Sequence, residues 1–154
     1  MNKLVAQTMA KKENGEKGFT LIELLVVVII IGILAAIAIP VFLNMREGAW
    51  KSSVESDVNN AVLAVEQAAQ ANNGGYTGFT SPVSANAEGK ASDTAKVGAS
   101  GKEQGFTASA NNKITVTIAA DGTYAVTGTN KDYGDTKVYK FTSKDGSKVW
   151  STTP

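Results

Sequence analysis

Residues Gly18 to Leu43 decide the fold of this chain, and they read GFTLIELLVVVIIIGILAAIAIPVFL. Apart from Thr20 and the carboxylate of Glu23, residues 19–43 are apolar. As an α-helix this stretch is about 37 Å long, enough to cross a bilayer core of about 30 Å with some tilt. A charged group inside lipid costs roughly 2.5–3.5 kcal/mol or more, so the carboxylate needs a partner in the membrane or in an assembly. We therefore expect a membrane-length helix that packs against copies of itself.

The overall composition excludes several classes of function. The 154 residues suit one domain plus an anchor, and a formal net charge of +1 gives no general electrostatic reason to bind nucleic acid. The sequence has no cysteine and no histidine, which excludes disulfides, thiolate chemistry, Cys/His zinc sites and histidine acid–base catalysis. No motif marks a Ser–Lys or carboxylate pair. We therefore expect neither an enzyme nor a cofactor.

The first half of the chain is predicted to be a leader followed by one long helix. Residues 1–18 are a polar leader whose lysines predict a cytoplasmic N-terminus, and residues 19–43 are the membrane helix. Residues 44–73 place apolar residues three or four positions apart, which predicts an amphipathic helix that the Asn72-Asn73-Gly74-Gly75 sequence ends. No loop signal separates the two helical parts, so we expect one helix of roughly 55 residues, about 80 Å long. Its apolar face consists of Trp50, Val54, Val58, Ala61, Val62, Val65, Ala68 and Ala69.

The second half of the chain is predicted to be a loop followed by a sheet. Residues 74–112 are rich in Gly, Ala, Ser, Thr and Asn, which predicts a long surface loop. Residues 113–154 alternate apolar and polar positions between turn sequences such as Asp121-Gly122 and Lys144-Asp145-Gly146. This pattern predicts three or four antiparallel strands. Packing the sheet on residues 50–69 of the helix buries the apolar faces of both, so the expected fold class is α+β.

The sequence at the start of the apolar stretch resembles a processing motif. Residues 18–23, GFTLIE, are similar to the cleavage site of type IV pilins and pseudopilins. The resemblance is of the type IVa kind and is close over residues 17–60. It implies that a prepilin peptidase cuts between Gly18 and Phe19 and that Phe19 is then N-methylated.

The same resemblance assigns roles in assembly to three further residues. It places Glu23 at the family's glutamate, and Gly32 and Pro40 at the helix-breaking positions of the N-terminal segment. It also implies the pilin fold, a long helix packed on a C-terminal antiparallel sheet. Two departures, the absence of cysteine and a leader longer than in Gram-negative type IVa pilins, suit a Gram-positive-type or otherwise atypical system.

The resemblance implies a structural function. A major pilin of this kind is a single-pass protein of the inner (cytoplasmic) membrane, which polymerises through its hydrophobic helix into a helical homopolymer after leader cleavage. It is then part of an extracellular pilus, or fimbrium, at the cell surface. The implied partners are the prepilin peptidase, a pilus assembly platform protein with its ATPase, the membrane and other copies of the chain. The alternative is a pseudopilin of a type II secretion or DNA-uptake (competence) system.

Each assembly residue has a plainer alternative explanation. Glu23 either pairs with the Phe19 ammonium of a neighbouring subunit or is an ordinary carboxylate at a helix start. The stretch from Gly32 to Pro40 either loosens when subunits pack or is a mild kink in a membrane helix. Ala36-Ile37-Ala38 also fits a signal-peptidase site, which would release a soluble domain starting at Ile39.

Two surface features of the second half are candidates for binding. Asp132 and Asp135 lie in one turn and could hold Ca²⁺ through their oxygens, although an ordinary polar turn explains them as well. The lysines of residues 113–148 are expected to be a solvated surface. Alternatively, they could pair with Glu55, Asp57 and Glu66 of a neighbouring subunit or attract DNA.

Overall fold

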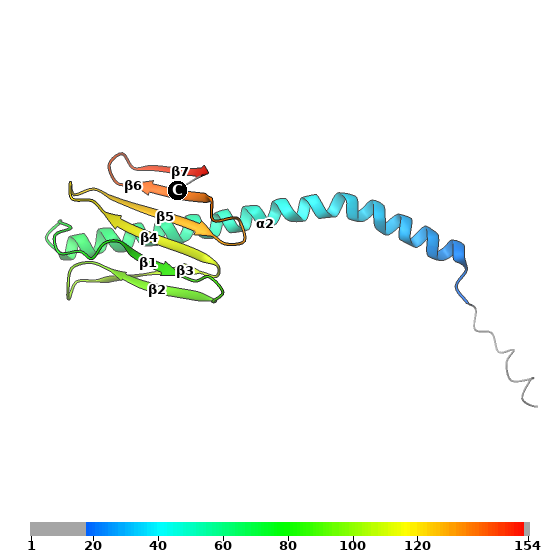
Figure 1. Cartoon of the computed structure of the whole chain (residues 1–154), viewed down its shortest axis with the longest axis horizontal. Coiled ribbons are helices and arrows are strands. Elements are labelled where there is room, and N and C mark those ends of the chain that lie inside the picture. The colour runs from blue at the N-terminus through cyan, green and yellow to red at the C-terminus, as the bar shows by residue number, and fades with distance from the viewer. Residues whose placement is uncertain (1–17, 153–154) are drawn as a thin grey trace, which may run out of the picture. The chain divides into compact units, whose positions relative to one another are not determined.

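The structure is a computed structural model that describes residues 18–152 (Figure 1). The chain divides into two compact units, Met1–Phe42 and Leu43–Pro154, and each is considered by itself. Helix α2, Leu21–Ala71, passes through both units without a break. The prediction of one continuous helix is therefore confirmed. Except for Gly18, the predicted leader lies outside the described residues.

The C-terminal end of α2 is set by the predicted Asn-Gly sequence. Asn73 and Gly74 have φ angles of 60° and 80°, in the left-handed region that asparagine and glycine adopt most readily. Their turn lets the Gly74 N–H donate to the Ala69 carbonyl at 2.8 Å. The Asn72 side chain then donates to the carbonyl of Gly75 at 3.0 Å. The helix thus ends in a satisfied cap.

Two antiparallel sheets follow the helix. The larger has five strands in the order β1-β4-β5-β6-β7, and the smaller consists of β2 and β3. The turns at Asp121-Gly122 and Lys144-Asp145-Gly146 connect neighbouring strands of the larger sheet as predicted. The α+β fold class is confirmed, with more strands than the predicted three or four. The strands are β1 Val83–Asn86, β2 Ser92–Val97, β3 Gln104–Ser109, β4 Asn112–Ile118, β5 Tyr124–Asn130, β6 Lys137–Thr142 and β7 Ser147–Thr152.

The prediction that residues 74–112 form only a loop is wrong. This segment contains β1, which pairs with β4, and the β2–β3 hairpin. The inward positions of these strands include Ala85 and Ala108, which are fully buried, and Phe106, which is 3% exposed. Because small alanines carry much of the burial here, the segment lacks the alternation of large apolar and polar residues on which strand prediction depends.

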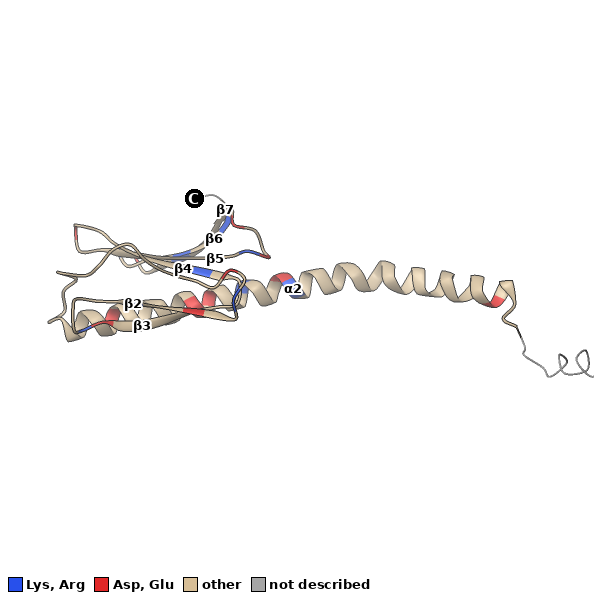
Figure 2. Cartoon of the chain, turned by 60° about the horizontal axis from the view of Figure 1, so that its bottom comes forward, with Lys and Arg blue, Asp and Glu red and all other residues tan. Residues whose placement is uncertain are grey.

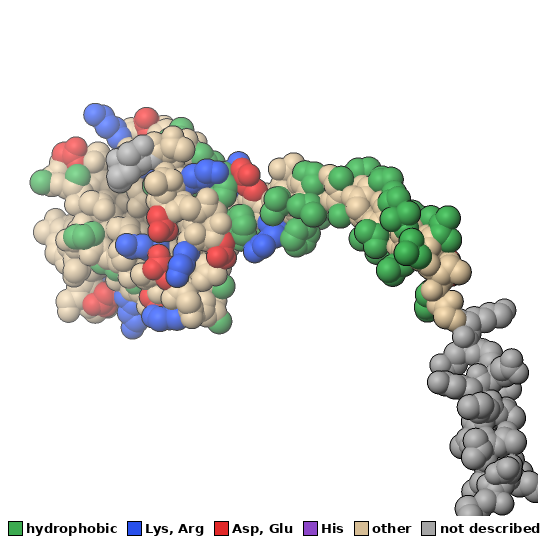
Figure 3. All heavy atoms as spheres, turned by 45° about the vertical axis from the view of Figure 1, so that its right-hand side comes forward, with side chains coloured by type: hydrophobic (Ala, Val, Ile, Leu, Met, Phe, Trp, Pro, Cys, Tyr) green, Lys and Arg blue, Asp and Glu red, His purple; other side chains and the backbone are tan. Residues whose placement is uncertain are grey.

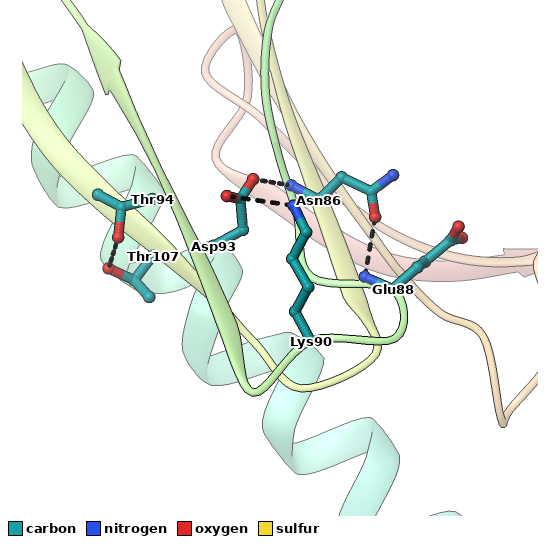
Figure 4. Close-up of polar contacts among 6 residues, drawn as sticks. All are labelled: Asn86, Glu88, Lys90, Asp93, Thr94 and Thr107. Atoms are coloured by element: carbon teal, nitrogen blue, oxygen red, sulfur yellow. Dashed lines mark hydrogen bonds and ion pairs between the residues drawn. The ribbon is translucent and has the colours of Figure 1, made fainter.

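Polar contacts support the connection between the two sheets (Figure 4). The backbone N–H of Asn86, at the end of β1, donates to the Asp93 carboxylate on β2 at 2.7 Å. Lys90 forms an ion pair with the same carboxylate at 3.8 Å. The hydroxyls of Thr94 and Thr107 share a hydrogen bond of 3.1 Å across the β2–β3 hairpin. These contacts fix the geometry of a segment that has few large side chains.

The core of the Leu43–Pro154 unit lies between α2 and the sheets. Val54, Val58, Ala61 and Val65 of α2 are fully buried, which confirms the predicted packing of the sheet on residues 50–69. The closest approach is at Gly128 of β5. A Cβ atom there would lie 2.7 Å from Val54 Cγ1 and 2.7 Å from Val58 Cγ2. This position therefore has room only for glycine.

A buried carboxylate connects the helix to the turn between β3 and β4. Asp57 is 4% exposed and accepts hydrogen bonds from the Ser109 N–H at 2.6 Å and from the Ser109 hydroxyl at 2.9 Å. It also accepts one from Asn112 Nδ2 at 2.7 Å. Asn112 in turn accepts a hydrogen bond from Asn130 Nδ2 at 2.7 Å. The network joins α2, β3, β4 and β5 through polar side chains that are all satisfied.

The acidic residues of the helix have partners within the same chain. Glu55 accepts from Trp150 Nε1 at 2.8 Å, and Glu66 accepts from the Tyr124 hydroxyl. Asp57 is bound in the network just described. The idea that these three carboxylates pair with lysines of a neighbouring subunit is therefore wrong for Asp57, which is buried, and is weakened for the other two.

Candidate functional site

The candidate site is the apolar surface of α2 and the residues just before it. Every large hydrophobic side chain from Phe19 to Met45 is at least 47% exposed, and Phe19 itself is 90% exposed. Figure 3 shows hydrophobic side chains along this part of the helix. An 18-residue window of α2 has a mean hydropathy of 3.3, so the helix is long and apolar enough to cross a membrane. Figure 2 shows that the same part of the helix carries a long stretch without charge.

The start of α2 is a reciprocal hydrogen-bonded cap. The Glu23 N–H donates to Thr20 Oγ1 at 3.3 Å, while the Thr20 N–H donates to Glu23 Oε2 at 2.9 Å. The Thr20 hydroxyl also donates to Glu23 Oε2, at 2.8 Å. This is a capping box, in which two N–H groups that a helix start leaves open are both satisfied. Thr20 was not among the predicted site residues, although a Thr followed three residues later by Glu is a recognisable sequence signal.

The cap gives Glu23 a role within its own chain. Its Oε2 atom holds the helix start, while among the described residues no hydrogen bond to Oε1 is found. The plainer explanation of Glu23, a carboxylate at a helix start, therefore has a structural basis. Pairing with a neighbour's Phe19 ammonium stays a prediction.

The predicted processing site lies before the helix. Gly18 and Phe19 are both exposed and are not helical, since α2 begins at Leu21. A peptidase needs access to an extended, unpaired backbone, so the Gly18–Phe19 bond is in a suitable setting. Cleavage at this bond and N-methylation of Phe19 stay predictions.

Gly32 and Pro40 both lie inside the unbroken helix. A Cβ atom at Gly32 would meet no heavy atom within 4 Å, so nothing in the described residues requires glycine at this position. Pro40 lacks the N–H that would bond to the Ala36 carbonyl. The helix continues through this missing hydrogen bond. The loosening of this stretch on assembly stays a prediction.

The two candidate calcium ligands face different partners. Asp132 Oδ2 accepts a hydrogen bond from Asn111 Nδ2 at 2.9 Å. Asp135 lines a hollow of about 720 Å³ on the outer face of the larger sheet, together with Lys113 and Lys140. Among residues 18–152, no group of three or more acidic side chains is placed to hold a metal ion. Calcium binding by Asp132 and Asp135 stays a prediction beside the ordinary polar turn.

Comparisons with known proteins point to one family. The family model of the prokaryotic N-terminal methylation motif matches residues 14–39. The type IV major fimbrial protein of Dichelobacter nodosus is 53% identical over 51 residues, which cover 33% of this chain and 33% of that protein. The type IV major alpha-pilin of Moraxella bovis is 44% identical over 55 residues, covering 36% and 35%. The type IV wide pilus major component of Thermus thermophilus is 49% identical over 61 residues, covering 40% and 46%.

The extent of these matches is limited. In these three cases the chain spans between 33% and 46% of the curated relative's length. No solved structure shows a significant match to the chain. Because the methylation motif lies where α2 begins and these relatives are all pilus or fimbrial subunits, the N-terminal segment of the chain is similar to that of type IV pilins.

Proposed function

We propose that this chain is a major structural subunit of a type IV pilus that polymerises through the apolar part of α2. The observation that carries the proposal is the contrast between the two parts of this helix. From Val54 onward one face is buried against the sheets, whereas the large apolar side chains from Phe19 to Met45 are exposed in the single chain. Such a surface is stable only in lipid or against other protein.

The proposed cycle uses both environments in turn. The helix first anchors the subunit in the cytoplasmic membrane, with the leader inside and the Leu43–Pro154 unit outside. A prepilin peptidase then cuts between Gly18 and Phe19, and Phe19 is N-methylated. An assembly ATPase, acting through a platform protein, transfers the subunit into the filament, where the helices of other copies replace the lipid. The role is structural and needs no catalytic residue.

Glu23 fits this cycle because its charge must be compensated at each stage. At the helix start the capping box satisfies Oε2 and the positive end of the helix dipole favours a carboxylate. In the dry core of a filament the ammonium of a neighbour's Phe19 would neutralise the remaining charge and set the axial register between subunits. Association of this head-to-tail kind does not close, so it propagates into a filament.

The test compares Glu23→Ala with the unaltered chain in a cell that lacks its own copy of the gene. We expect both chains to be cleaved and both to be present in the membrane, with surface filaments formed only by the unaltered chain. Leu63→Ala is a matched control, because Leu63 is 59% exposed on α2 but lies outside the proposed interface. A normal filament yield from Glu23→Ala would contradict the pairing.

The same experiment separates the pilin from the pseudopilin alternative. Long surface filaments that disappear when the gene is deleted support the major pilin. A defect in secretion or DNA uptake, without visible surface filaments, would instead assign the chain to a type II secretion or competence system. Cross-links between Phe19-region residues of different subunits are expected in both cases and would be missing if the chain were an anchored module that never polymerises.

A further inference from the structure

The outer face of the larger sheet carries a polar hollow of about 720 Å³. Its floor consists of threonine side chains from two neighbouring strands. Thr115 on β4 lies opposite Thr127 on β5, and Thr129 is two residues further along β5. These threonines are half-buried, and the hollow has the volume of about 300–1,000 Å³ that is usual for small-molecule sites. We call this site the outer hollow.

Two lysines flank the threonines of β5. Lys113 on β4 is paired with Thr129, and Lys140 on β6 is paired with Thr127. Because neighbouring strands are about 4.8 Å apart and rise about 3.4 Å per residue, the Cα atoms of the two lysines are about 12 Å apart. Both side chains line the outer hollow, one on each side of β5. They are therefore placed to contact two separate anionic groups of one extended ligand.

Two carboxylates complete the charged lining of the outer hollow. Glu88 belongs to the turn between β1 and β2, and Asp135 belongs to the turn between β5 and β6. The Glu88 N–H donates to Asn86 Oδ1 at 3.0 Å, which holds the backbone of that turn. Figure 4 shows that the Glu88 carboxylate is directed away from Lys90 and Asp93. Glu88 is thus fixed by its backbone while its charge faces outward.

The turns that carry these carboxylates are tied to each other. Asn111, in the turn between β3 and β4, accepts a hydrogen bond from the Gly89 N–H at 3.1 Å. Its Nδ2 atom donates to Asp132 Oδ2, in the β5–β6 turn, at 2.9 Å. One asparagine thus connects three turns at the same end of the sheet. A lining held by strands and by connected turns is organised before a ligand binds.

The charged groups of the outer hollow are not paired with one another. In the described part of the chain, the two ion pairs lie elsewhere, one on α2 and one between the β1–β2 turn and β2. Within these residues, neither lysine of the hollow forms an ion pair with Glu88 or Asp135. All four charged groups are therefore open to a ligand.

The chemistry of these groups indicates what such a ligand carries. Ammonium groups only donate hydrogen bonds, carboxylates only accept them, and threonine hydroxyls do both. The ligand must therefore offer anionic acceptors to the lysines and neutral donors, such as hydroxyls, to the carboxylates. A chain of uniform negative charge, such as DNA, would be repelled by Glu88 and Asp135. A peptide is often bound by its backbone along a free sheet edge, but β4, β5 and β6 each have a neighbour on both sides.

We propose that the outer hollow binds an acidic polysaccharide, a sugar chain whose residues carry carboxylates. The carboxylates of the sugars accept hydrogen bonds from Lys113 and Lys140. Sugar hydroxyls donate to Glu88 and Asp135 and exchange hydrogen bonds with the threonines of the floor. This inference goes beyond the proposed function and does not rest on it, because the outer hollow is formed within one Leu43–Pro154 unit.

The first test compares two forms of one sugar chain. The full chain in micelles of an uncharged detergent is titrated with a short oligomer of galacturonic acid, and binding is followed by calorimetry. A calcium chelator in the buffer excludes bridging by metal ions. The matched probe is the methyl ester of the same oligomer, which lacks the negative charges. Each exposed ion pair contributes a factor of about two to five in affinity, so we expect the ester to bind about 4- to 25-fold more weakly. Equal binding of both forms, or of neither, would overturn the proposal.

The second test removes the lysines. Lys113→Gln with Lys140→Gln is expected to lower the affinity for the galacturonic acid oligomer about 4- to 25-fold. Lys96→Gln with Lys144→Gln is the matched control, because it changes the net charge equally at two exposed lysines that do not line the outer hollow. Tryptophan fluorescence shows whether each variant is folded. The same loss of affinity in both pairs would assign the binding to net charge alone, against the proposal.

The third test addresses the carboxylates and the class of ligand. We expect the unaltered chain to bind single-stranded DNA, or a peptide of alternating lysine and glutamate, more weakly than the galacturonic acid oligomer. Glu88→Gln with Asp135→Asn removes the repulsion and should strengthen binding of the DNA about 4- to 25-fold, with a smaller gain for the sugar. Tighter binding of the DNA or the peptide by the unaltered chain would contradict the proposal. These titrations involve neither cleavage nor filaments, so their failure would leave the proposed pilus function standing.

Discussion

The replacement Asp57→Ala tests whether the buried polar network holds the globular unit together. It removes the acceptor of three hydrogen bonds, two from Ser109 and one from Asn112. The Ser109 hydroxyl is partly exposed and can turn to water, and Asn112 Nδ2 keeps a second acceptor, Ser53 Oγ, at 2.9 Å. The Ser109 N–H keeps no such alternative, so its pairing is the largest loss.

The size of the effect follows from the number of bonds that are truly lost. A hydrogen bond to a charged group contributes about 1.5–3 kcal/mol, and a buried donor left without a partner costs about 1–3 kcal/mol. Since the Ser109 N–H is the one donor left unpaired and the other two bonds to the carboxylate are also lost, we expect Asp57→Ala to lower the free energy of unfolding by about 3–5 kcal/mol. A domain is typically stable by about 5–15 kcal/mol, so this loss is a large fraction of the total.

The assay is urea unfolding of the full chain in detergent micelles, followed by tryptophan fluorescence. Ser56→Ala is the matched control, because Ser56 is the neighbouring helix residue and is exposed. We expect it to change the free energy of unfolding by less than about 0.5 kcal/mol. If Asp57→Ala costs no more than the control, the network does not stabilise the unit and the reasoning is refuted.

Three further predictions follow from the packing, the tyrosines and the helix. Gly128→Ala places a methyl group against Val54 and Val58 and should lower the free energy of unfolding by about 1–3 kcal/mol, whereas an unchanged urea midpoint would show that the helix can move away. Burial, and then the hydrogen bond to Glu66, raise the pKa of Tyr124 above its ordinary value of 10.0. The unfolded chain therefore loses the Tyr124 proton at a lower pH than the folded chain, so the free energy of unfolding should fall as the pH rises above 10.0. A free energy of unfolding that does not change above pH 10.0 would contradict this reasoning. Pro40→Ala restores a helical hydrogen bond and removes a steric clash, which together are worth about 3 kcal/mol. If the helix must loosen at this stretch for assembly, the variant should be cleaved normally but should yield fewer filaments. An unchanged filament yield would leave the mild kink in a membrane helix as the explanation of Pro40.

Local sequence patterns predicted those elements whose burial depends on large apolar residues. The spacing of Val54, Val58 and Val65 marks the buried face of α2, and the alternation of Ile114 and Val116 with threonines marks β4. Both signals act over a few residues and involve side chains that are clearly apolar. The same rule fails in residues 74–112, where buried alanines and glycine turns replace large side chains.

Contacts between distant residues could not be predicted from the sequence. Glu47 and Tyr133 are 86 positions apart, and Glu55 and Trp150 are 95 apart. Before the topology is known, Glu55 looks like a solvent-facing helix residue that could pair with Lys51 at a spacing of four. The structure instead gives Glu55 the indole of Trp150, whereas Lys51 pairs with Glu47, which the same spacing of four also predicts.

The candidate site was predictable to the extent that it is local. The apolar stretch, the junction at Gly18 and Phe19, and the position of Glu23 all lie within 26 consecutive residues. The capping bonds of Thr20 to Glu23 are local as well and could have been found from the spacing alone. What the helix packs against in an assembly depends on other copies, and a single chain does not contain that information.

The most direct test of the account is the N-terminus of the chain isolated from surface filaments, determined by mass spectrometry. The account predicts a mature chain that begins at Phe19 and carries one N-methyl group. A chain that keeps Met1, or one that begins at Ile39, would contradict it.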